Sequence, residues 1–185
     1  MDVLQCLVVS AGVSANFCAH VLKDSPKPTQ FGPAYNPTFF EVYGQGNIVR
    51  ASHGVRRNLN VDGLRAFDLR TFKPSGEAWG FNKSSDRREA RRYVEEEKPT
   101  WVIGCPPCTF FSSWNQSMNH RKMDPEVVEK LRKEAVRHLR FVIGLYGIQI
   151  SNGRHFLHEH PETATSWSDP AMVALLELPK VASVV

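Results

Sequence analysis

TWVIGCPPCTFFSSW, residues Thr100–Trp114, is the stretch that decides the expected fold. Its apolar run Trp101–Ile103 predicts a buried strand. The next residues include the pair Pro106–Pro107, which has no N–H group to give to a ladder of strands, so the chain must turn there. A rigid turn after a buried strand holds Cys108 at the edge of a sheet, where open α/β sheets bind their ligands. This position suits a nucleophilic thiol.

Segments that favour strands and segments that favour helices alternate along the chain, which is typical of a parallel sheet with helices on its faces. The expected strands are Thr38–Tyr43, Leu64–Leu69, Trp101–Gly104, Phe156–Glu159 and Val181–Val185, and the expected helices are Asn47–His53, Ser85–Glu97, Pro125–Ile150 and Asp169–Leu178. Residues 109–123 are expected to form a mobile surface loop. The predicted fold class is therefore α/β, with a mostly parallel sheet, flanking helices and the last strands missing.

The length of 185 residues fits one domain, and 42% hydrophobic residues are enough for a core. We expect this domain over residues 38–185. Residues 1–37 are expected to precede it as an apolar segment, Met1–Leu22, and a proline-rich linker, Lys23–Pro37. The apolar segment is expected either to pack on the domain as a helix or to be an appendage.

Charge and cysteine content limit the classes of partner and compartment. The net charge of +4 is compatible with a polyanionic partner but falls short of a dedicated nucleic-acid-binding composition. Four cysteines are too few for a small disulfide scaffold and fit a reducing compartment, so we expect a nuclear or cytoplasmic protein. No membrane segment is expected, because the apolar stretch Val3–Ala15 is too short to span a bilayer and Asp2 stands where a signal peptide carries a basic residue.

A second candidate site follows the strand predicted at Thr38–Tyr43. The chain runs from this strand into Gly44-Gln45-Gly46 and then into a helix, so the backbone can approach a ligand closely and the first helical N–H groups can face it. An ordinary tight turn remains the alternative. Asp68 stands near the end of the next strand, where an acid can accept hydrogen bonds from ribose hydroxyls, and an exposed loop acid is the alternative.

Taken together, these residues resemble the DNA cytosine-5 methyltransferase family. The family's Pro-Pro-Cys turn with a Phe-Ser soon after it is matched by Pro106-Pro107-Cys108 with Phe111-Ser112. Its Glu-Asn-Val strand end is matched by Glu159-His160-Pro161, where only the glutamate is kept. The family places an acid four residues before the first glycine of the turn, and here Phe40 holds that position while Glu41 lies one residue later. The family's later Gln-x-Arg-x-Arg stretch and recognition region are not seen, so we expect a chain truncated at its C-terminus.

The resemblance implies a Rossmann-like methyltransferase fold and a reaction. Cys108 would add to carbon 6 of a cytosine, and Glu159 would protonate ring nitrogen 3. S-adenosylmethionine would be the cofactor, held at Gly44, Gln45 and Gly46, with Asp68 on its ribose and Pro106 beside it, and no metal is implied. DNA is the expected partner and RNA the second candidate, and the target base must leave its stack to reach the site.

Other readings of the same residues remain open. A domain of this kind could bind S-adenosylmethionine or a partner without turnover. Cys105 and Cys108 form a C-x-x-C, which could be the redox pair of a thiol oxidoreductase. The same cysteines with His158 and His160 could bind zinc. Methyltransferases that act on exocyclic amines are disfavoured, because they carry an aromatic residue after the Pro-Pro pair.

Overall fold

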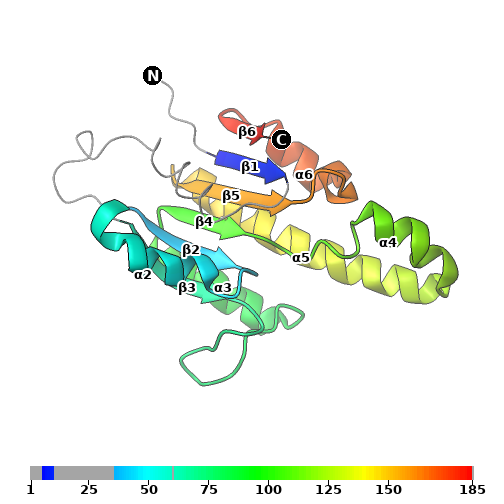
Figure 1. Ribbon diagram of the computed structural model, residues 1–185, viewed down its shortest axis with the longest axis horizontal. Coiled ribbons are helices and arrows are strands. Elements are labelled where there is room, and N and C mark those ends of the chain that lie inside the picture. Colours follow the sequence, from blue (N-terminus) through cyan, green and yellow to red (C-terminus); the bar gives the residue numbers. More distant parts are fainter. Residues whose placement is uncertain (1–5, 11–35, 60, 185) are drawn as a thin grey trace.

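Six parallel strands form one sheet in the order β3-β2-β4-β5-β1-β6 (Figure 1). This computed structural model describes residues 6–10, 36–59 and 61–184. The strands are β1 (Cys6–Ser10), β2 (Thr38–Val42), β3 (Asp62–Phe67), β4 (Trp101–Gly104), β5 (His155–His160) and β6 (Val181–Val184). The α/β class, the parallel sheet and the flanking helices expected from the sequence are therefore confirmed.

Helices cover both faces of the sheet. They are α2 (Asn47–Leu59), α3 (Ser84–Glu97), α4 (Ser113–Met118), α5 (Pro125–Ser151) and α6 (Pro170–Leu176), with short 3-10 turns η2 (His120–Lys122) and η3 (Thr165–Ser168). On one face, Ile48 and Val49 of α2 pack on a cluster that includes Trp101 and Leu157. On the other face, α3, α5 and α6 pack on a larger cluster around Phe156. None of the helices in the described part of the chain combines the length and apolarity that a membrane crossing requires.

Side chains along β5 alternate between these two faces, as the period of a strand requires. Phe156 belongs to the cluster under α5 and Leu157 to the cluster under α2. By the same alternation His158 and His160 face α5, and Glu159 faces α2. The strand therefore presents its last two histidines and its glutamate to different layers.

The chain reverses its direction across the sheet between β2 and β4. From β2 it moves to the edge strand β3, and it then returns past β2 to β4 on the other side. β2 and β4 are neighbours, and the connection after β2 leads to β3 on one side, whereas the connection after β4 leads to β5 on the other side. In open α/β sheets such a switch point, at the carboxyl ends of the strands, is where ligands bind.

The helix ends follow local signals that the sequence predicted. Asp124 caps α5, since its carboxylate accepts a hydrogen bond from the N–H of Glu126, and Pro125 occupies the first turn. Gly153, with φ of 65°, follows the last residues of the helix. Asp169 caps α6 in the same way, through the N–H of Ala171.

Three expected segments differ from the structure. The loop expected at 109–123 contains α4 and η2, so that prediction was wrong. The strand expected at Leu64–Leu69 runs over Asp62–Phe67, and Asp68 lies just beyond it. Within residues 1–37, Cys6–Ser10 is a strand between β5 and β6 rather than part of a helix or an appendage. Most of the proline-rich linker lies outside the described residues.

Candidate functional site at the carboxyl ends of the strands

The Pro-Pro turn is fastened to both neighbouring strands. Gly104, the last residue of β4, lies in register with His158 of β5. The next residue, Cys105, donates its N–H to the carbonyl of Val42 on β2, at 3.0 Å. Beyond it, the carbonyl of Pro106 lies 2.8 Å from Nε2 of His160. The turn is therefore held at the end of β5, close in the chain to Glu159.

His160 makes two hydrogen bonds that define its protonation. Because the Pro106 carbonyl only accepts, Nε2 must carry the proton, and Nδ1 can then accept from the hydroxyl of Ser166 at 2.6 Å. Burial lowers the pKa of His160, and the Pro106 carbonyl opposes this only in part. The ring is thus neutral and acts as a tie between β5, the Pro-Pro turn and η3.

A second buried pair lies under the same turn. The hydroxyl of Tyr146 on α5 is 3.0 Å from Nδ1 of His158 and 3.4 Å from the carbonyl of Gly104. A Cβ atom at Gly104 would lie 2.1 Å from this hydroxyl, so only glycine fits there. Among the residues that the structure describes, Nε2 of His158 has no hydrogen-bond partner, and burial holds the pKa of this histidine well below its usual value. The floor of the site is close-packed and uncharged.

The two residues expected to carry the chemistry reach the same edge of the sheet. Cys108 is partly exposed, and its carbonyl accepts hydrogen bonds from Phe111 and Ser112, which begin the approach to α4. Glu159 is partly buried, and burial raises its pKa. Within the described residues no hydrogen bond or ion pair fixes the Glu159 carboxyl group. The structure therefore brings the Pro-Pro-Cys turn and the end of β5 to the same edge of the sheet. In the described part of the chain, neither the Cys108 thiol nor the Glu159 carboxyl group makes a hydrogen bond or an ion pair.

The glycine turn after β2 is shaped by a buried acid that the sequence pattern placed one residue too late. Glu41 is 1% exposed, and its carboxylate accepts hydrogen bonds from the N–H groups of Ile48 and Val49 at 2.9 and 3.2 Å. A Cβ atom at Gly44 would lie 1.9 Å from Oε1 of Glu41, so the turn requires glycine there. Burial raises the pKa of Glu41, although these hydrogen bonds oppose the effect. The sequence contained a signal for this hydrogen-bonding role of Glu41, namely an acid within an apolar strand just before a glycine turn.

The donors that face a ligand at this turn differ from those expected. Glu41 already occupies the first helical N–H groups of α2. In contrast, the N–H groups of Gly44, Gln45 and Gly46 make no hydrogen bond within the described part of the chain. Gln45 and Gly46 have φ values of 58° and 75°, so this stretch is a tight left-handed turn. The turn itself, rather than the helix, offers the free backbone donors.

Asp68 and the glycine turn are connected through Arg70. One carboxylate oxygen of Asp68 accepts from the N–H of Arg70 at 2.9 Å, and Nη1 of Arg70 donates to Oε1 of Gln45 at 2.9 Å. The other oxygen of Asp68 makes no hydrogen bond within the described residues. Asp68 is thus both a local turn acid and a carboxylate with one oxygen still able to accept.

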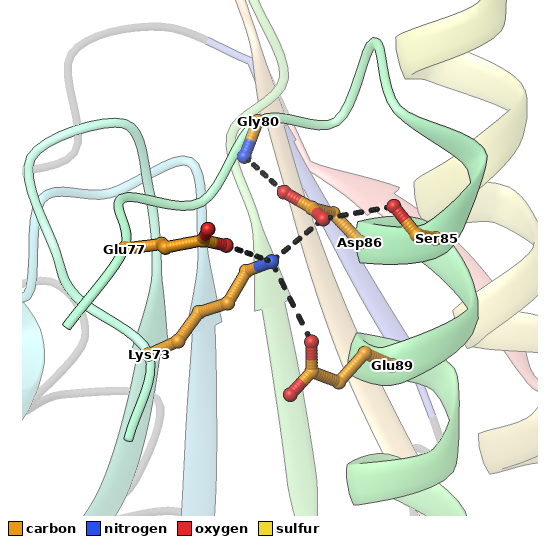
Figure 2. A network of polar contacts seen from close by, with 6 residues as sticks. All are labelled: Lys73, Glu77, Gly80, Ser85, Asp86 and Glu89. Carbon is orange, nitrogen blue, oxygen red and sulfur yellow. Dashed lines mark hydrogen bonds and ion pairs between the residues drawn. The ribbon is translucent and has the colours of Figure 1, made fainter. Parts of the chain in front are cut away.

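The connection from β3 to α3, residues 68–83, is here named the strap. A buried ion pair fixes it, because Nζ of Lys73 lies 2.7 Å from Oδ1 of Asp86, with Glu89 and Glu77 at 3.6 and 3.8 Å (Figure 2). The other oxygen of Asp86 accepts from the N–H of Gly80 at 2.8 Å. Asp86 lies in the helix expected at Ser85–Glu97, and nothing nearby in the sequence indicates this role, because its partner Lys73 lies in another segment.

The zinc reading is not supported by this geometry. Within the described residues, no group of three or more His, Cys, Asp or Glu side chains is placed to hold a metal ion. Both ring nitrogens of His160 are already bonded, and Cys105 packs in the cluster on the α2 face while His158 faces α5. The four side chains therefore do not converge.

Comparison with known proteins adds no assignment to this picture. No protein-family model matches the chain. No curated protein matches its sequence at a significant level. The functional argument accordingly rests on the residues and their arrangement.

Proposed function

We propose that this protein is an S-adenosylmethionine-dependent methyltransferase of the cytosine-5 type, acting on DNA, with Cys108 as nucleophile and Glu159 as acid. The observation that carries the proposal is the register between β4 and β5, which pairs Gly104 with His158. It brings the Pro-Pro-Cys turn and the glutamate-bearing strand end to one edge of the sheet. His160, which stands where the family pattern has asparagine, ties the two segments through the Pro106 carbonyl.

The glycine turn is suited to the proposed cofactor. The N–H groups of Gly44 and Gln45, which make no hydrogen bond within the described residues, can donate to the carboxylate or ribose oxygens of S-adenosylmethionine, whereas Gly46 is buried. The Asp68 oxygen that is unbonded among the described residues can accept from a ribose hydroxyl. Pro106 lies at the carboxyl end of β4, the neighbour of β2. When bound, the cofactor supplies the methyl group that carbon 5 of the base accepts.

The chain's own residues then have defined tasks. The Cys108 thiolate forms a bond from its sulfur to carbon 6 of the cytosine, and the electrons of the carbon 5–carbon 6 double bond make carbon 5 nucleophilic. Burial raises the pKa of Glu159, which favours its protonated form, and in that form the carboxyl group can give its proton to nitrogen 3 of the ring. After methylation, loss of the carbon 5 proton to solvent, return of the nitrogen 3 proton to the Glu159 carboxylate and cleavage of the sulfur–carbon 6 bond restore the ring, the acid and the thiolate.

Covalent trapping tests the nucleophile. DNA containing 5-fluorocytosine cannot lose its carbon 5 substituent, so the wild-type protein with S-adenosylmethionine should form a complex that survives denaturation. Cys108→Ser should abolish the complex, and Cys105→Ser is the matched control that should retain it. Glu159→Gln should slow trapping by about a hundredfold. Unchanged capture in Cys108→Ser would remove the nucleophile assignment.

A non-catalytic, cofactor-binding role is the second candidate. The observation that favours it is the Glu159 carboxyl group, which nothing in the described part of the chain positions. Calorimetry separates the two roles, because binding of S-adenosylmethionine, weakened by Asp68→Ala, without any covalent trapping would favour the binding role. Absence of binding to the wild-type chain would reject both candidates.

A further inference from the structure

The first ten residues of α5 include no buried side chain, and at the end of this stretch Glu134 accepts a hydrogen bond from Asn82. The helix has 27 residues, about 40 Å of length, whereas the strands beneath it have four to six residues, at most about 20 Å. Its buried residues begin only at Ala135, and α4 and η2 have none. Figure 1 shows this part of α5 and α4 extending past the ends of β4 and β5. We name Ser113–Glu134 the overhang.

An apolar stripe runs along α5 from the domain into the overhang. Ala135, His138 and Val142 lie on this stripe and are buried against the domain. Val127 and Leu131 continue it at spacings of four residues, yet they are 45% and 37% exposed. Solvent therefore reaches the same helix face that the sheet covers one turn later.

The overhang also carries half of the large hydrophobic side chains that are exposed in the described residues. They are five of ten, namely Trp114, Met118, Met123, Val127 and Leu131. On α4, Trp114 and Met118 are one helical turn apart and are 70% and 45% exposed. Such a concentration on one projection is typical of an interaction surface.

Charges beside the stripe fit a copy of the same helix in the opposite direction. Glu126 and Lys130 stand one turn apart next to Val127 and Leu131, and no ion pair joins either of them to another described residue. Glu129, by contrast, is paired within the helix with Arg132 and Lys133. In an antiparallel pair, Glu126 of each copy can face Lys130 of the other, whereas in a parallel pair the two-fold axis would put these residues on opposite flanks of the contact.

We propose that the overhang is a dimer interface, in which α5 of one copy packs antiparallel on α5 of a second copy about a two-fold axis. Val127 and Leu131 then form a shared apolar centre, flanked by two reciprocal Glu126–Lys130 pairs. The contact is isologous, so it closes on itself and stops at a dimer. It is independent of the proposed methyl transfer, and its test uses no activity measurement.

Sedimentation of the full chain over a wide range of concentration tests the interface. The wild-type protein is expected to be a reversible dimer. Leu131→Arg should raise the dissociation constant by about tenfold or more, because it places a charge at the apolar centre of the contact. Val173→Arg is the matched control, since Val173 is also an aliphatic helix residue, 41% exposed, and lies on α6 away from the overhang. It should leave the dimer unchanged.

Charge-reversal variants distinguish specific antiparallel pairing from nonspecific hydrophobic association. Glu126→Lys alone and Lys130→Glu alone should each weaken the dimer by about tenfold, because each places like charges opposite one another. The double variant should restore it. A wild-type monomer at all concentrations would overturn the proposal, and so would a dimer that persists in Leu131→Arg or a double variant weaker than both single ones. A monomer that binds duplex DNA through Val127 and Leu131 would overturn it in favour of a nucleic-acid surface.

Discussion

The strap and the overhang leave the same end of the sheet, yet they are stabilised in opposite ways. The strap, after β3, buries Trp79 and Phe81 and holds the ammonium group of Lys73 against Asp86. The overhang, which follows the Pro-Pro turn, has no buried residue within its helical segments until Ala135. The strap is thus anchored in the domain by a buried aromatic pair and an ion pair, although Leu69 and Phe72 are exposed, whereas the helical segments of the overhang have no buried anchor.

This contrast separates internal stability from association. Substitutions at the buried residues of the strap, Lys73, Trp79 and Phe81, should change the free energy of unfolding of a single chain, because these side chains lie in a low-dielectric interior. Substitutions in the overhang should change contacts with other molecules and leave that free energy nearly unaltered.

The largest effect is expected at the ion pair of the strap. Asp86→Asn leaves the buried ammonium of Lys73 without its closest countercharge, so we expect a loss of about 3 kcal/mol in the free energy of unfolding. Urea denaturation followed by circular dichroism measures it. Arg132→Gln, which breaks an ion pair on the exposed face of α5, is the control and should leave the midpoint unchanged. Equal effects of the two variants would contradict the contrast.

A smaller loss is expected under the Pro-Pro turn, which precedes the overhang in the chain. Gly104→Ala places a Cβ atom against the Tyr146 hydroxyl and should cost about 2 kcal/mol. Removing that oxygen with Tyr146→Phe should recover part of this loss in the double variant. If the close contact were not the cause, the losses in the Gly104→Ala and Tyr146→Phe single variants would add up to the loss in the double variant.

Acid should destabilise the domain in two steps that begin at different pH values. Burial, to which the neighbouring His160 adds, lowers the pKa of His158 below 6.5, and burial also lowers that of His160. Because both are harder to protonate when folded, their contribution is complete above pH 6.5 and is lost as the pH falls below it, by up to about 1.4 kcal/mol per pH unit for each. The buried His138 acts in the same direction.

The second step belongs to the strap. Burial alone would raise the pKa of Asp86, but hydrogen bonds from Lys73, Gly80 and Ser85 hold it below 3.8. Its contribution is therefore present above pH 3.8 and lost as the pH falls through the lower, folded value. Denaturation midpoints measured against pH should show both steps. His160→Asn should reduce the first step alone, and Asp86→Asn the second alone.

The smallest effect is expected in the overhang. Trp114 is 70% exposed, so Trp114→Ala should change the free energy of unfolding of the monomer by less than about 0.5 kcal/mol. Chemical denaturation at low protein concentration checks this. A loss of several kcal/mol would mean that Trp114 belongs to the packed domain and that the contrast with the strap is wrong.

Local signals in the sequence were sufficient for the elements that carry the candidate site. The apolar run before Pro106 predicted β4, Pro161 marked the end of β5, and Asp124 with Pro125 marked the start of α5. These signals act within a few residues, so one sequence displays them. The register that places Glu159 beside the Pro-Pro turn involves residues far apart, and it was only an expectation from the family resemblance.

What the sequence failed to show depends on distant partners. Asp86 looked like a surface acid because Lys73, which buries it, lies on another segment. Tyr146 looked like one more apolar residue of α5, although its hydroxyl reaches His158 and the end of β4. Glu41 was set aside for standing one residue from the family position, yet its carboxylate reaches the start of α2 across the glycine turn.

The placement of β1 has a consequence for how the chain folds during synthesis. Cys6 pairs with Phe156 on one side and with Val181 on the other. β1 can therefore join the sheet only after the ribosome has added about 150 further residues for β5 and about 175 for β6. Such sequence-distant parallel pairing slows folding, since a long stretch of chain must be closed before any contact forms. Until it docks, β5 is an open edge of the sheet, and the newly made protein is exposed to mispairing with its neighbours on the ribosome.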